Sequence, residues 1–196
     1  PHMIIDPLYG FVFFGLFSPG PNVVLLTASG ARFGIRRTLP HLFGVVLGVG
    51  ITAGLTGLGI AALLQQAPML ELALKIAASG WMLYMAWGLW HSDRRKGKAE
   101  RDRPMTLIEA VLFQWVNPKV WAVALAAASA YPGTAGPWWE AMRLGTAFSG
   151  INLVCCLFWT SAGALLTYLL TTPAAWRVFT RIMAVALGSF SVMVFL

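Results

Sequence analysis

Long runs of apolar residues fill most of this chain, and short polar stretches separate them. A helix needs about 20 predominantly apolar residues to cross a bilayer. Six runs reach this length, at roughly 5–30, 41–65, 68–91, 107–131, 139–170 and 174–196. We therefore expect an all-α integral membrane protein whose six transmembrane helices form a single domain over residues 3–196. Pro1 and His2, before Met3, are interpreted as an expression scar.

Two of these runs are interrupted near the middle by proline beside a polar residue. The interruptions are Pro19-Gly20-Pro21-Asn22 in the first run and Asn117-Pro118-Lys119 in the fourth. Proline has no backbone N–H and pushes the preceding residue away from helical dihedral angles. Lipid offers no hydrogen-bond partner, so polar groups at membrane depth need a cavity or a protein partner. The two breaks indicate that helices one and four are discontinuous and line a transport pathway.

The first break is expected to end one half-helix and to start another at Pro21. Proline suits the first position of a helix, and the N–H groups of Asn22, Val23 and Val24 would then point into the gap. Such a helix start carries partial positive charge and attracts carboxylates. A proline kink that only shapes helix packing is the alternative interpretation. Two prolines around one glycine favour a functional break.

The second break has the same form and adds a cation. Asn117 is a good N-cap residue and Pro118 a good first helical residue. A helix running through Pro118 would leave the carbonyl of Gln114 unpaired. Lys119 lies about 20 Å from the start of its run at Thr106, which is deep for a side chain that would otherwise snorkel to the interface. We expect Lys119 to bind a substrate anion or to take part in proton coupling.

The two breaks also suggest an internal repeat. Shifting the sequence by 97 residues places Pro21 on Pro118 and Asn22 on Lys119. Each break would lie in the first helix of a three-helix half, and because three is odd the halves have opposite orientations. This is the layout of a 3+3 inverted repeat, in which broken helices meet at a midplane site.

Composition agrees with a membrane protein, and the placement of charge predicts its orientation. Apolar residues make up 58% of the chain, charged residues 11%, and the mean hydropathy is +0.72, whereas a soluble domain is about a quarter charged. Eleven of the fourteen basic residues fall in the first, third and fifth loops: Arg32, Arg36, Arg37, Arg94, Arg95, Lys96, Lys98, Arg101, Arg103, Arg177 and Arg181. By the positive-inside rule these loops are cytoplasmic and both termini lie outside. Acidic residues interleave with the third-loop cluster, so nucleic-acid binding is not expected.

A few other polar residues lie within the apolar runs. Asn152 is well inside the fifth run, where its amide needs partners either in helix packing or in the substrate path. Cys155 and Cys156 point to different sides of the same helix and are expected to act as small hydrophobes. His41 and His91 have no second ligand at metal spacing, so we expect neither a metal site nor a cofactor.

Local motifs indicate how two of the helices are built. Thr106 and Glu109 match a capping box at the start of the fourth run. In the second run, the spacings from Gly44 to Gly48 and from Gly50 to Gly54 allow helices to approach closely, either within one subunit or in a homodimer. The sequence contains no nucleophile, base and acid set, no Walker loop and no zinc-protease motif. It is therefore not expected to be an enzyme.

The chain resembles the LysE/RhtB family of bacterial amino-acid exporters. The resemblance rests on the Pro19 to Asn22 motif, the Gly30-Ala31-Arg32-Phe33-Gly34 stretch with its glycine-rich following helix, the basic third loop and the Trp115-Val116-Asn117-Pro118-Lys119 stretch. It implies a secondary transporter of the cytoplasmic membrane that exports amino acids in exchange for protons. It also implies that the transport core comprises Pro19, Gly20, Pro21, Asn22, Asn117, Pro118 and Lys119.

The absence of a deep carboxylate bears on the substrate. The middle of the second run reads Leu47-Gly48-Val49-Gly50-Ile51, and a cationic side chain would be desolvated there without a partner. This favours neutral substrates of the homoserine, threonine or branched-chain kind. The alternatives are an exporter of basic amino acids or divalent metals, and, from another class, a membrane scaffold that transports nothing.

Overall fold

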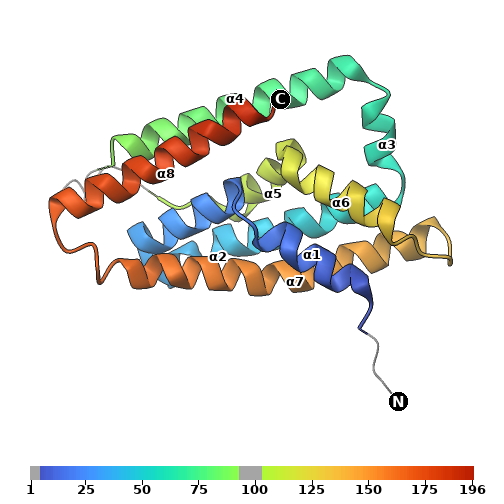
Figure 1. The fold of residues 1–196 in the computed structure, drawn as a ribbon, viewed down its shortest axis with the longest axis horizontal. Coiled ribbons are helices and arrows are strands. Elements are labelled where there is room, and N and C mark those ends of the chain that lie inside the picture. Colours follow the sequence, from blue (N-terminus) through green and yellow to red (C-terminus); the bar gives the residue numbers. More distant parts are fainter. Residues whose placement is uncertain (1–4, 93–102) are drawn as a thin grey trace.

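The computed structural model describes residues 5–92 and 103–196, and the secondary structure within these ranges is helical without strands. The expectation of an all-α protein is confirmed. The expression scar at residues 1–2 and most of the basic third loop, from Arg94 to Arg101, lie outside the described residues. The elements, drawn in Figure 1, are α1 (Pro7–Phe17), α2 (Pro21–Gly57), α3 (Ile60–Gln65), α4 (Pro68–Trp90), α5 (Leu107–Val116), α6 (Pro118–Ala130), α7 (Pro137–Leu166) and α8 (Pro173–Met193).

Helix α2 contains a reversal of the chain at Gly34. This glycine has φ 78° and ψ 171°, a conformation that only glycine adopts without strain. The hydroxyls of Ser29 and Thr38 lie 2.9 Å apart, whereas nine residues of straight helix would separate them by about 13 Å. We call residues 21–33 the first arm of α2 and residues 35–57 its second arm. The pattern predicts a loop at 31–40, yet the chain stays helical on both sides of the single glycine.

The six expected segments can be followed through these helices. The first comprises α1 and the first arm of α2, with the break at residues 18–20. The second is the second arm, which ends at Gly57, and α3, which begins after Gly59 with φ 90°. The fourth is α5 and α6, which meet at an angle of 64° at Asn117. Helices α4, α7 and α8 form the other three.

Length and composition mark several of these helices as membrane spans. Within the described ranges, α2, α4 and α7 are long and apolar enough to cross a bilayer, and the bent pair α5–α6 makes a fourth candidate. Helix α1 is a shorter apolar helix. Large apolar side chains lie on the surface of α4, among them Met69, Ile76 and Leu83. Such exposure suits contact with lipid rather than water.

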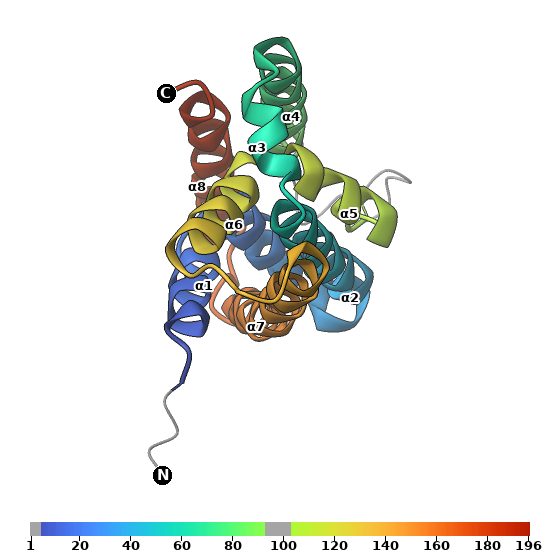
Figure 2. The same cartoon turned by 90° about the vertical axis from the view of Figure 1, so that its right-hand side faces the viewer.

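Most of the helices pack side by side in pairs. Helix α2 packs along α7, and α4 packs along α8 in a separate pair (Figures 1 and 2). Helix α1 also contacts α6, while α5 contacts α2. The predicted inverted repeat stays a prediction.

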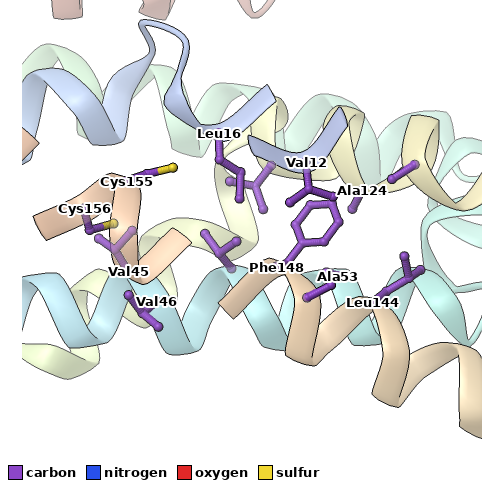
Figure 3. Packing of buried hydrophobic residues seen from close by; sticks show 14 of the residues in the cluster. Val12, Leu16, Val45, Val46, Ala53, Ala124, Leu144, Phe148, Cys155 and Cys156 are labelled. Atoms are coloured by element: carbon purple, nitrogen blue, oxygen red, sulfur yellow. The ribbon is translucent and has the colours of Figure 1, made fainter. Parts of the chain in front are cut away.

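The main core lies between α1, α2, α6 and α7. Figure 3 shows Val12 and Leu16 of α1 facing Phe148 and Cys155 of α7. Val45 and Cys156 belong to the same cluster. Both cysteines are buried and free, as expected for small apolar side chains.

Glycines allow the backbones of α2 and α7 to approach closely. A Cβ at Gly30 would overlap the carbonyl oxygen of Thr160, and a Cβ at Gly163 would overlap that of Thr27. In the second arm, Gly44 packs on Leu107 in the same manner. The predicted role of the second-run glycines in packing within the subunit is confirmed, and a homodimer stays a prediction.

Candidate functional site

The break in the first segment exposes the carbonyl end of α1 inside the protein. Ser18 closes part of this end, since its N–H donates to Phe14 O at 3.2 Å and its hydroxyl donates to Gly15 O at 2.9 Å. The indole Nε1–H of Trp159 on α7 donates to Phe17 O at 3.2 Å. These bonds satisfy carbonyls that a continuous helix would pair.

Lys119 supplies the donor for the remaining carbonyls at this break. Its ammonium donates to Ser18 O, and Pro19 O lies 3.3 Å from Nζ. The side chain lies directly over Gly20, where a Cβ would be 2.7 Å from the Lys119 Cδ. The carbonyl end of a helix carries partial negative charge, so it stabilises the ammonium. The cation of the second break is thus held by the backbone of the first.

A pair of amides makes a second link between the breaks. Asn22 Nδ2 donates to Gln114 Oε1 at 2.7 Å, and Gln114 Nε2 donates back to Asn22 Oδ1 at 3.0 Å. The side chain of Gln114 is fully buried and also donates to Ala110 O. Asn117 Nδ2 lies 3.4 Å from the same Gln114 oxygen. Three amides from both halves therefore form one connected cluster.

Both half-helices begin where the sequence predicts. Pro21 and Pro118 occupy the first turns of α2 and α6, and the Asn117 side chain caps α6 by accepting from Lys119 N at 3.2 Å. One expectation is wrong in part. The N–H of Val24 donates to Gly20 O at 3.1 Å, so it does not point into the gap for a ligand.

Asn152 lies apart from these direct contacts. It is 4% exposed, and within the described structure its Nδ2 has no hydrogen-bond partner. A buried amide without a partner costs free energy. The role of Asn152 in the substrate path stays a prediction.

The structure brings together Pro19, Gly20, Asn22, Gln114, Asn117 and Lys119, with Pro21 and Pro118 setting the backbone between them. Sequence reasoning missed Ser18 and Trp159. A tryptophan inside an apolar run was the available signal, because a buried indole N–H needs an acceptor.

The capping box is present at the start of α5, where Glu109 also receives two hydrogen bonds from Arg103.

The side chains gathered at this site are amides and one ammonium. Among the described residues, no group of three or more His, Cys, Asp or Glu side chains could hold a metal ion. Discontinuous helices that meet inside a membrane protein and expose backbone groups to one another are typical of secondary transporters. Fold and site therefore define the class of membrane translocators.

Comparison with known proteins agrees with this class. The family model described as "LysE type translocator" matches residues 13–196. The chain belongs to this family, and the resemblance found in its sequence is confirmed.

Several other proteins share part of the sequence. An uncharacterized membrane protein of Pseudomonas aeruginosa is 31% identical over 55% of this chain and 54% of its own length, so the match spans about half of that relative. A "Cysteine/O-acetylserine efflux protein" of Klebsiella pneumoniae is 25% identical over 83% of each chain. A "Leucine efflux protein" of an Enterobacter species is 27% identical over 55% of this chain and 53% of its own. No solved structure matches the chain significantly.

Proposed function

We propose that this protein exports neutral amino acids from the cytoplasm across the cytoplasmic membrane, in exchange for protons. The observation that carries the proposal is the position of Lys119, whose ammonium bridges the two broken helices at Ser18 and Pro19. A substrate carboxylate is a stronger partner for an ammonium than two neutral carbonyls are. An amino acid that displaces these carbonyls would loosen the link between the halves, and substrate binding would thus be coupled to a change of shape.

Lys119 is also the residue that binds and releases the proton during transport in this proposal. A lysine that loses its aqueous surroundings releases its proton more readily, and a bound carboxylate opposes that release. Substrate binding and proton binding would then be linked at Lys119.

The distribution of acidic groups supports a neutral side chain on the substrate. The described carboxylates Asp6, Glu71, Glu109 and Glu140 all lie at the ends of helices. None adjoins the Lys119 site to balance a second positive charge. The names of two relatives refer to cysteine, O-acetylserine and leucine. The side chains of these amino acids are a thiol, an ester and an alkyl group, and none of them carries a net charge.

The orientation follows from the basic loops. Arg36 and Arg37 follow the Gly34 turn, and Arg103 lines one cavity with Arg32 and Phe33, which precede that turn, so these arginines lie at one end of the molecule. We propose that this end faces the cytoplasm and that both termini lie outside. The surrounding partner is then the lipid bilayer, and no nucleic acid or cofactor takes part.

Transport by purified protein in proteoliposomes tests this function. We expect efflux of L-leucine, L-threonine, L-homoserine or O-acetyl-L-serine that is faster with an inward proton gradient than without one. Lysine, arginine and cadmium in the same vesicles serve as controls and should show little movement. Rapid efflux of a dibasic amino acid or of cadmium would overturn the proposal that the substrates are neutral. Efflux at the same rate with and without a pH gradient would overturn the proposed exchange with protons.

A further inference from the structure

A cavity of about 330 Å³ lies at the end of the molecule that carries the basic loops. The first arm of α2, the C-terminal part of α4 and residues 103–105 form its walls. Its volume is at the lower end of the range for small-molecule sites. Apolar side chains such as Leu25, Met85 and Met105 provide most of its lining.

His41 is the polar residue of this cavity that has no partner. It is 2% exposed, it lines the cavity, and neither ring nitrogen makes a hydrogen bond within the described structure. Leaving a buried polar group unpaired costs about 1–3 kcal/mol. Because this unpaired imidazole lines a cavity, a molecule bound in the cavity could supply the missing hydrogen bonds.

Two other polar residues of the lining, Ser29 and Arg103, already make side-chain hydrogen bonds. The Ser29 hydroxyl is bonded to Thr38 at 2.9 Å. The guanidinium of Arg103 is held by both oxygens of Glu109, and this hydrogen bonding raises the pKa of Arg103 above its ordinary value. The imidazole of His41, in contrast, makes no hydrogen bond within the described structure.

The cavity adjoins the broken helices. Leu25 follows Asn22 by one turn of α2, and Glu109 precedes Gln114 on α5 by about 7 Å at helical rise. Along the second arm of α2, Gly48 packs on the Gln114 side chain, about ten ångström beyond His41. The Asn22–Gln114 amide pair therefore lies between the cavity and the Lys119 site.

We propose that this cavity is a chamber that binds the amino acid on the cytoplasmic side before it reaches Lys119. The imidazole of His41 binds the polar backbone groups of the amino acid, and the apolar walls accept its side chain. The Asn22–Gln114 pair closes the inner end of the chamber and must separate for passage. This inference rests on the proposed function and adds to it a second binding site and its ligand class.

The first test is protection of a thiol placed in the chamber. Gly88 lines the cavity, and a Cβ there meets no atom within 4 Å, so Gly88→Cys should fit. We expect N-ethylmaleimide to label Gly88→Cys and L-leucine to slow this labelling. Ser92→Cys, just beyond the end of α4 and outside the lining, is the matched control and should show no protection. Wild-type protein reports background labelling of the buried Cys155 and Cys156.

The second test compares two variants that each remove an unpaired polar group from α2. His41→Leu should weaken binding of radiolabelled L-leucine to the purified protein by about tenfold, the scale of one lost hydrogen bond. Thr52 is also buried with an unpaired hydroxyl but does not line the cavity, so Thr52→Val should leave binding unchanged. Thermal unfolding of both variants controls for loss of fold.

The outcomes separate this inference from the function on which it rests. Unaltered leucine binding by a folded His41→Leu protein, or equal labelling of Gly88→Cys with and without leucine, would overturn the chamber. If wild-type protein at the same time exports leucine, the proposed function stands without the chamber. Failure of the wild-type protein to export any neutral amino acid would overturn both.

Discussion

Lys119 is the residue at which the smallest chemical change should have the largest effect. Lys119→Met keeps the length of the side chain and removes the ammonium that joins Ser18 and Pro19. We expect normal insertion and loss of net efflux in proteoliposomes. Lys119→Arg should also lose exchange with protons, because a guanidinium does not readily release its proton. Efflux at the wild-type rate by Lys119→Met protein, present at normal membrane levels, would show that the lysine has a structural role only.

The amide pair of Asn22 and Gln114 should behave as one unit. Because both hydrogen bonds run between these two side chains, replacing either residue with alanine removes both bonds. In a double-mutant cycle on unfolding free energy, Asn22→Ala and Gln114→Ala should show a coupling of about 1 kcal/mol. Gln114→Ala combined with Ser189→Ala, an exposed residue on α8, should be additive. A coupling of zero for the first pair would mean that the amides do not meet in the folded protein.

Single residues also show what a sequence can and cannot reveal. The chemistry of proline made Pro21 and Pro118 predictable as helix starts, because a missing N–H leaves no helical hydrogen bond unmade in the first turn. The contact between Asn22 and Gln114 was not predictable, since it joins side chains 92 positions apart. The sequence presents His41 only as a possible metal ligand, because its burial without a hydrogen-bond partner is a property of the packed structure.

Among the helices, the crossing of α2 and α7 should tolerate no added volume. A Cβ at Gly163 would overlap the carbonyl of Thr27, so Gly163→Ala must push the two backbones apart. We expect this change to lower the stability of the detergent-solubilised protein by about 1–3 kcal/mol, measured by thermal unfolding.

The same helix offers a matched control. A methyl group at Gly150 would have no atom within 4 Å of it, and alanine is the better helix former by about 1 kcal/mol. Gly150→Ala should therefore be neutral or stabilising. Equal effects at the two sites would contradict the close crossing.

Helix boundaries were predictable only in part, for a physical reason. The break at Asn117 is set by local backbone chemistry, and sequence and structure agree there. The turn at Gly34 is different, because helical hydrogen bonding resumes immediately on both sides of one glycine. A polar stretch with three arginines is typical of a loop, and nothing in the sequence pattern shows that this stretch stays helical.

For the whole molecule, the orientation can be tested with loops that the structure describes. A cysteine in place of Thr171, between α7 and α8, should react with an impermeant thiol reagent only from the cytoplasm. A cysteine in place of Thr134, between α6 and α7, should react only from outside. The buried Cys155 and Cys156 should contribute little labelling. Labelling of both positions from one side would contradict the arrangement of six spans.

The tight reversal at Gly34 also affects how the protein is made. The first segment, interrupted at residues 18–20, carries unpaired backbone groups that make its transfer into lipid costly by several kcal/mol each. The second arm of α2 follows after one residue, with Ser29 already bonded to Thr38. We expect the two segments to leave the insertion machinery as a single helical hairpin, so that the apolar second arm and the broken first segment enter the bilayer together. Lengthening the turn should separate these events and lower the yield of inserted protein.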